Sequence, residues 1–253
     1  MTTPQPLSPV LFVGAGPGAA RHLTLGAYQA LQAAEVVIHD RLVGPEIMAL
    51  IPATVRLVDV GKEGFGPSTK QVEINAILVA HALTGARVVR LKGGDPGIFG
   101  RLDEEIDALE ANGLPYDILP GLTSATVAAA SIGQSLTKRG RNAALRIVTG
   151  HDMAGFAEQD WRGLARAGEV AAIYMGKKSA RFIQGRLMMH GAAGDTPVTL
   201  VENVSRADQR VLATTLSALP DTVALCDGPA IILYGLAPRA AALAITQLHE
   251  ATA

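Results

Sequence analysis

Residues 10–18 read VLFVGAGPG, an apolar run typical of a β-strand that leads directly into a turn with three glycines. Glycines at the end of a strand let the backbone turn sharply and let a ligand approach without a Cβ in the way. The turn also matches the loose dinucleotide-binding pattern G-x-G-x-x-A, and Asp40 ends the next expected strand, where a ribose-binding acid would lie. Because this pattern is weak alone, a dinucleotide site is only one interpretation of it.

The rest of the first half alternates short β-branched runs with helix-like segments, which predicts a mostly parallel sheet. One helix should begin at Ser68, which forms a capping box with Gln71. The expected strands are 10–13, 36–39, 55–60, 87–91 and 116–119, and the expected helices are 23–33, 68–84 and 101–112.

A second α/β set follows the turn at Pro120 and Gly121. It opens with the alanine-rich segment 123–132, which we expect to be a buried helix. The further strands are 145–149, 170–175, 197–202, 209–214 and 230–234, with a helix at 180–190. We therefore expect two α/β domains, residues 1–122 and 123–253, with the binding site in a cleft between them.

Composition narrows the classes of function. The 253 residues carry 22 basic and 23 acidic side chains, which leaves no broad basic surface for nucleic acid. The single cysteine, Cys226, excludes an internal disulfide and a cysteine-based zinc cluster, and the histidines lack metal-ligand spacing. We see no secretory signal and no apolar run long enough to span a membrane. These features predict a cytoplasmic protein without a metal or a membrane partner.

Two further turns follow expected strands. Residues 91–96 read LKGGDP, and residues 120–125 read PGLTSA. Each turn has a simpler interpretation, a tight turn in the first and a helix cap by Thr123 or Ser124 in the second. Because the carboxyl ends of parallel strands meet at one edge of a sheet, all three glycine-rich turns are expected on one rim, and this favours a ligand site.

Charged residues are expected on the same rim. Asp40 and Lys62 follow the second and third strands and could act as a base and acid pair. A surface ion pair, worth about 0 to 1 kcal/mol, is the alternative. In the second half, Lys138, Arg139 and Arg141 form the densest basic cluster, which is either a solvated loop or a site for an acidic small molecule.

With these motifs in view, the sequence resembles the tetrapyrrole methylases, and within them the enzymes that methylate carbon atoms of uroporphyrinogen III. The resemblance extends from Val13 to about Tyr234. The most diagnostic elements are DRLV at 40–43 and VGK at 60–62. The others are VGAGPG at 13–18, residues 88–96, FGR at 99–101, PGLTSA at 120–125, YMG at 174–176 and VEN at 201–203.

The resemblance implies a homodimer of two-domain α/β subunits, with mostly parallel and mixed sheets, that binds S-adenosylmethionine in the cleft. By position, the cofactor contacts would be Pro17, Gly93, Gly94, Asp95, Ile98, Thr123, Ser124, Met175 and Val204. Asp40 would take a proton and Lys62 would supply one.

The implied reaction is two methyl transfers that convert uroporphyrinogen III through precorrin-1 to precorrin-2, for sirohaem or cobalamin synthesis. Since this substrate carries eight carboxylates, the candidates for binding it are Arg41, Lys138, Arg139 and Arg141.

Three other functions stay open. One is a methylase acting later on the corrin ring, against which DRLV argues. Another is a nicotinamide- or flavin-dependent oxidoreductase, which would leave the turns at 93–95 and 120–125 unexplained. The third is a cofactor-binding regulator without activity, against which the presence of both Asp40 and Lys62 argues.

Overall fold

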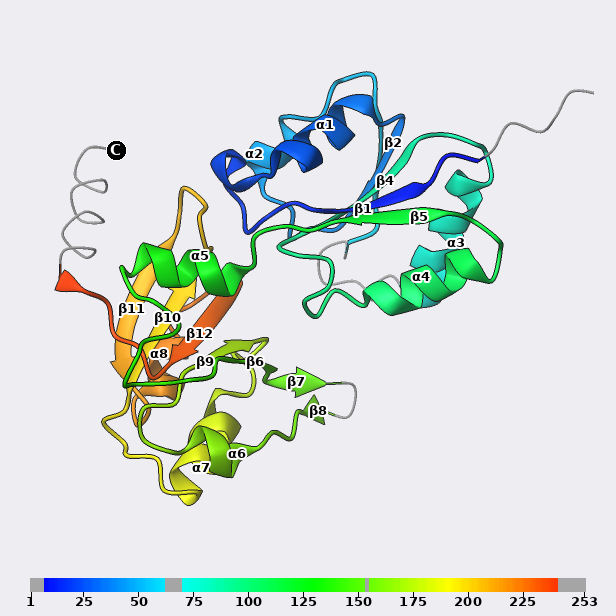
Figure 1. The fold of residues 1–253 in the computed structure, drawn as a ribbon. Helices are drawn as coiled ribbons and strands as arrows, with labels where there is room; N and C mark the ends of the chain where they lie inside the picture. The colour runs from blue at the N-terminus through cyan, green and yellow to red at the C-terminus, as the bar shows by residue number, and fades with distance from the viewer. Residues whose placement is uncertain (1–6, 62–69, 153–154, 241–253) are drawn as a thin grey trace, which may run out of the picture. The chain divides into compact units, whose positions relative to one another are not determined.

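The computed structural model describes residues 7–61, 70–152 and 155–240. The chain divides into two compact units, Met1–Thr123 and Ser124–Ala253, each with its own sheet (Figure 1). In the described ranges, no helix is long and apolar enough to cross a membrane, and no group of three or more His, Cys, Asp or Glu side chains could hold a metal ion.

The first unit contains a five-stranded parallel sheet in the order β3-β2-β4-β1-β5. Its strands are mostly apolar because both faces are covered by helices. Phe12 packs on one face and its neighbour Val13 on the other, as the alternation of side chains along a strand requires. The strands are β1 (Val10–Gly14), β2 (Val36–His39), β3 (Arg56–Asp59), β4 (Val88–Lys92) and β5 (Tyr116–Leu119).

Helices cover the two faces of this sheet, as Figure 1 shows. On one side lie the short turn η1 (Ala20–His22) and the helices α1 (Leu25–Ala33) and α2 (Pro45–Met48), which pack through residues such as Leu31 and Ile47. On the other side lie α3 (Gln71–Ala82) and α4 (Leu102–Glu110), which pack through Leu78 and Leu109.

The second unit has a mixed five-stranded sheet in the order β11-β10-β12-β9-β6, in which only β6 and β9 run parallel. Its strands are β6 (Arg146–Thr149), β9 (Ala171–Tyr174), β10 (Pro197–Glu202), β11 (Arg210–Thr215) and β12 (Ala230–Tyr234). A small hairpin of β7 (His151–Asp152) and β8 (Gly155–Phe156) follows β6. The mixed sheet and the parallel sheet together confirm the predicted fold class.

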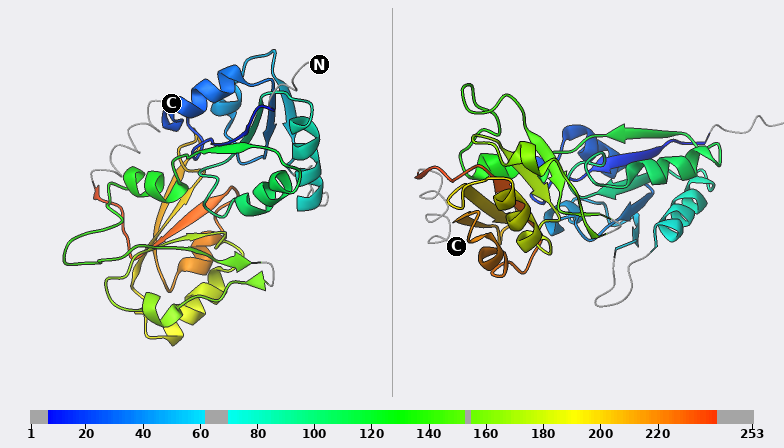
Figure 2. Two further views of the ribbon diagram at one scale, coloured as in Figure 1. Left: turned by 45° about the vertical axis from the view of Figure 1, so that its right-hand side comes forward. Right: turned by 90° about the horizontal axis from the view of Figure 1, so that it is seen from below.

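Helix α5 (Ser124–Ser131) covers one face of the second sheet through Ala125, Ala128 and Ala129, as its alanine-rich sequence predicts. The other face packs against α6 (Trp161–Leu164), α7 (Ala180–Met189) and α8 (Leu219–Val223). Figure 2 shows this layering from two further directions.

The main difference from the predicted elements is at the start of α3. This helix begins at Gln71 rather than at Ser68, so the capping box assigned to Ser68 and Gln71 is wrong; Ser68 itself lies outside the described residues. Instead Lys70 is the N-cap, and its backbone N–H donates to the carboxylate of Glu73 at 3.1 Å. The pattern S/T-x-x-E/Q occurs by chance, and here an acid in the first turn provides the cap.

Candidate functional site

The carboxyl ends of all five strands of the first sheet lie along one edge, because the strands are parallel. Gly14 ends β1, Lys92 ends β4 and Leu119 ends β5, so the turns that follow them are neighbours. The structure therefore brings together the three glycine-rich turns that the sequence places on one rim.

The first two turns are joined by backbone hydrogen bonds. Gly16 N–H donates to Gly94 O at 3.1 Å, and Gly94 N–H donates to Gly16 O at 2.8 Å. Ala15 N–H donates to Lys92 O at 2.8 Å, which continues the pairing of β1 with β4 beyond the sheet. Both turns are thus held in one fixed arrangement.

The third turn packs against the other two without room for side chains. A Cβ on Gly14 would lie less than 3 Å from backbone atoms of Gly121 and Gly94, and a Cβ on Gly121 would lie equally close to Gly94 O and Gly14. These contacts are closer than real Cβ atoms make, so glycine is required at both positions.

Asp95 joins the second turn to the third through its carboxylate. Oδ1 accepts a hydrogen bond from Gly97 N–H at 2.8 Å, and Oδ2 accepts one from Gly121 N–H at 2.9 Å. A carboxylate that accepts two backbone hydrogen bonds fixes the shape of a loop more firmly than a neutral group does. Asp95 therefore organises this rim, whatever else it binds.

We expect Asp95→Ala to lower the free energy of unfolding by about 1 to 3 kcal/mol, because it leaves two backbone donors without their acceptor. Chemical denaturation would measure the change. Asp117→Ala is the matched control, since Asp117 accepts one hydrogen bond from the adjacent Ile118 N–H on an exposed part of β5. Equal losses in the two variants would show that Asp95 does not join the turns.

The rim leaves space beside part of its backbone. Gly94 adopts a φ of +72°, and a Cβ placed there would meet no other atom within 4 Å. Of the predicted cofactor contacts in this unit, Gly93, Gly94, Asp95, Ile98 and Thr123 are half-buried, whereas Pro17 is buried. The backbone at Gly94 is therefore not covered by side chains of the described residues.

Asp40 follows β2 on the same rim and is half-buried. Its Oδ1 accepts a hydrogen bond from Leu42 N–H at 2.9 Å, which holds the carboxylate in a fixed direction. Arg41 faces Asp59, with Nε 4.0 Å from Oδ2 and about half of each side chain exposed. Lys62 lies outside the described residues, so its distance from Asp40 is not defined.

A buried cluster of charges joins the end of β4, immediately before the Gly93-Gly94 turn, to α4; the sequence motifs did not indicate it. Glu105 of α4 receives hydrogen bonds from Arg90 Nε at 3.1 Å and from Lys92 Nζ at 2.9 Å. All three side chains are at least 95% buried. Burial and the charge of Arg90 lower the pKa of Lys92, while Glu105 and Asp40 act in the opposite direction. The spacing of Arg90 and Lys92 by two residues, on one face of a buried strand, was the signal available in the sequence.

Of the predicted cofactor contacts in the second unit, Ser124 begins α5, and Met175 and Val204 lie at one edge of the sheet. Met175 follows β9 and Val204 follows β10, and both strands run antiparallel to β12, so their ends are on the same side. Met175 is half exposed and Val204 is buried. Met175 has a φ of +52°, and Asn203 and Ser205 on either side of Val204 also have positive φ values. Such backbone conformations are uncommon outside glycine and concentrate at functional sites.

The basic loop at 138–141 is only partly available to a ligand. Lys138 and Arg139 are exposed. Arg141 is half-buried, and it donates to Ser135 O at 2.7 Å and to Asn142 Oδ1 at 2.9 Å. Its guanidinium thus stabilises its own loop.

A known protein family matches most of this chain, including the part that forms the rim. The family described as tetrapyrrole (corrin/porphyrin) methylases matches residues 9–220, a range that contains every predicted site residue. The chain belongs to the tetrapyrrole methylase family. The family resemblance stated from the sequence motifs is thereby confirmed.

Related sequences of this tetrapyrrole methylase include enzymes named siroheme synthase. The protein from Edwardsiella ictaluri is 44% identical over 232 residues, which cover 92% of this chain and 50% of that protein. Siroheme synthase 3 from Aeromonas hydrophila is 43% identical over 226 residues, covering 89% and 48%. The chain therefore spans about half the length of these relatives.

Solved structures extend the comparison. The uroporphyrin-III C-methyltransferase of Thermus thermophilus, complexed with S-adenosylhomocysteine, is 35% identical with a TM-score of 0.78, covering 90% of this chain and 97% of that one. A cobalt precorrin-4 methyltransferase has a TM-score of 0.79 at 24% identity and shares the fold.

Proposed function

We propose that this tetrapyrrole methylase transfers two methyl groups from S-adenosylmethionine to uroporphyrinogen III, giving precorrin-2 through precorrin-1. The observation that carries the proposal is the rim of three glycine-rich turns with open space beside Gly94. It is supported by the similarity, over nearly the whole length of both chains, to a uroporphyrin-III C-methyltransferase complexed with S-adenosylhomocysteine.

The residues of the rim suit such a cofactor. The turn at Gly93 and Gly94 offers backbone without side chains, and Asp95 holds that turn against Gly121. Ile98, Thr123, Ser124, Met175 and Val204, together with Pro17, stay predicted contacts. When bound, S-adenosylmethionine supplies a methyl group on a sulfonium, whose C–S bond breaks as the bond to the pyrrole carbon forms.

Asp40 is the residue of this chain that we assign to the proton transfer. A pyrrole carbon that gains a methyl group becomes part of a cation, and a proton must then leave the macrocycle. A half-buried carboxylate, held in place by Leu42 N–H, stabilises that cation and can accept the proton. Lys62 stays the predicted proton donor, and Arg41, Lys138, Arg139 and Arg141 stay predicted partners of the substrate carboxylates. The homodimer and the cytoplasmic location also stay predictions.

The decisive experiment is anaerobic incubation of the protein with uroporphyrinogen III and S-adenosylmethionine, followed by mass analysis of the macrocycle. We expect a product that carries two added methyl groups and none in a control without the cofactor. An unchanged macrocycle would contradict the proposed step. Methylation of a later corrin intermediate alone would assign the chain to another branch of the family.

A further inference from the structure

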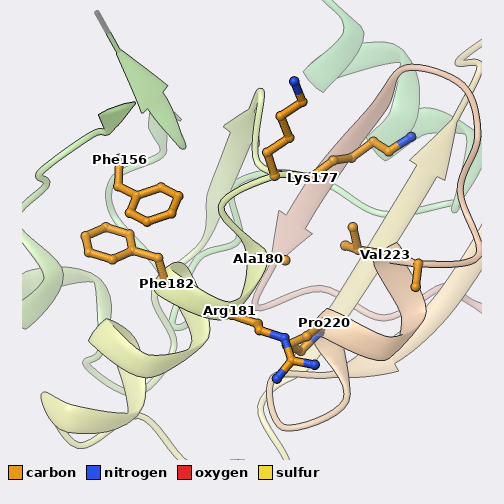
Figure 3. Close-up of a pocket in the computed structure, with 9 residues that line it drawn as sticks. Phe156, Lys177, Ala180, Arg181, Phe182, Pro220 and Val223 are labelled. Carbon is orange, nitrogen blue, oxygen red and sulfur yellow. The ribbon is translucent and has the colours of Figure 1, made fainter. Parts of the chain in front are cut away.

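A pocket in the second unit carries positive charge that the predicted site residues do not include. It has a volume of about 640 Å³ and lies between the start of α7 and the helix α8 (Figure 3). Lys177, Lys178 and Arg181 line it, and no carboxylate is among its described lining residues. The first turn of α7 also contains no acid, so the partial positive charge of this helix end adds to that of the three side chains.

The three cations differ in whether they already form hydrogen bonds or ion pairs within the protein. Lys177 Nζ donates to Gly228 O at 2.7 Å, which ties the segment before α7 to the residues that precede β12. Lys178 and Arg181 are exposed, and neither forms an ion pair with another described residue. These two side chains therefore have donors left for an anionic ligand.

The remaining walls are apolar. The rings of Phe156 and Phe182 stack at 4.8 Å with an interplanar angle of 17°, and 54% of Phe156 is exposed. Figure 3 shows this pair on one side of the pocket and Val223 on the other. Apolar walls next to cations fit an organic acid with an unsaturated body better than they fit a small inorganic anion.

Lys177, the first of the three lining cations in the sequence, lies two residues after Met175, a predicted cofactor contact. On the basis of the proposed function, we propose that Lys178 and Arg181 bind carboxylates of the tetrapyrrole substrate and so contribute to its recognition. Arg141, one of the predicted substrate contacts, donates to its own loop, whereas these two cations keep free donors beside an apolar wall. The pocket thus supplies a carboxylate site that the sequence motifs did not indicate.

Binding of uroporphyrin III, the oxidised and fluorescent octacarboxylate, tests this assignment directly. In Lys178→Ser/Arg181→Ser we expect a dissociation constant about tenfold higher than in the wild type, as for two partly exposed ion pairs. The difference should shrink at high salt. Turnover of uroporphyrinogen III should show a higher KM, with kcat and the affinity for S-adenosylhomocysteine nearly unchanged.

The matched control is Arg162→Ser/Arg166→Ser, which removes two exposed cations elsewhere in the same unit. This control should bind uroporphyrin III as the wild type does. Wild-type affinity for uroporphyrin III in the Lys178→Ser/Arg181→Ser variant would overturn the pocket assignment. Equal losses of affinity in both double variants would also overturn it, because equal losses would indicate a general effect of net charge. With either of these two outcomes, the proposed function still stands if the wild-type protein methylates uroporphyrinogen III. A wild-type protein that neither binds nor methylates the macrocycle would overturn both.

Discussion

Glu105→Gln is expected to lower the free energy of unfolding by about 3 to 5 kcal/mol, because it leaves two buried cations without a counter-charge. Glu105 is 1% exposed and accepts hydrogen bonds from both Arg90 and Lys92. A glutamine keeps the volume of the side chain but brings an amide N–H₂ and no charge. Urea denaturation of the two proteins at neutral pH would measure the difference.

Lys92→Met is the control that separates loss of charge balance from loss of packing. It removes one of the two cations and leaves Arg90 paired with Glu105, so the cluster becomes neutral. Replacing part of a buried ionic group by an apolar side chain of similar volume is often close to neutral in stability. We therefore expect a loss of less than about 1.5 kcal/mol. A larger loss than in Glu105→Gln would contradict the electrostatic explanation.

The pH dependence gives a second check. In the folded protein, burial and Arg90 lower the pKa of Lys92, so the unfolded chain binds more protons than the folded one between the two pKa values. Stability rises with pH in that range. Removal of the Glu105 carboxylate lowers the folded pKa further. The deficit of Glu105→Gln should therefore shrink as the pH rises from about 7 toward about 10.

The sequence was sufficient to predict the strands of both sheets because most of them are short, mainly apolar runs. Four strands, 36–39, 116–119, 197–202 and 230–234, were predicted at their observed bounds, and the other predicted strands differ by one residue at one or both ends. The small elements α2, α6, α8 and the hairpin β7 and β8 were not predicted. They have two to five residues each, too few for a periodic pattern to be recognised.

Part of the candidate site could be predicted from the sequence, and part could not. Glycine-rich turns after parallel strands must share an edge, so the proximity of Gly14, Gly94 and Gly121 followed from the sequence. The pairing of Arg90 with Glu105 did not follow from the sequence. It joins a strand residue to a helix residue 15 positions later, so it depends on how α4 packs on β4. The same holds for Lys178 and Arg181, whose pocket requires α8 and Phe156 to be in place.

Asp40→Asn should reduce turnover by about two orders of magnitude or more, with little change in the melting temperature or in the affinity for S-adenosylhomocysteine. Asparagine keeps an Oδ1 that can accept the hydrogen bond from Leu42 N–H, so the turn after β2 should persist. What it loses is the negative charge and the ability to take a proton. The alternative, a surface ion pair, would cost only about 0 to 1 kcal/mol of stability.

Asp59→Asn is the matched control for Asp40→Asn. Asp59 ends the neighbouring strand β3, and its Oδ1 likewise accepts a backbone hydrogen bond, from Gly61 N–H at 2.7 Å. Both variants remove one carboxylate charge from the same rim, yet only Asp40 is assigned to the proton transfer. We therefore expect kcat to fall in Asp40→Asn and to stay near the wild-type value in Asp59→Asn. A variant of Asp40 that keeps its turnover but melts at a lower temperature would show that this carboxylate stabilises the fold, and the predicted role of Lys62 as its partner would then lose its basis.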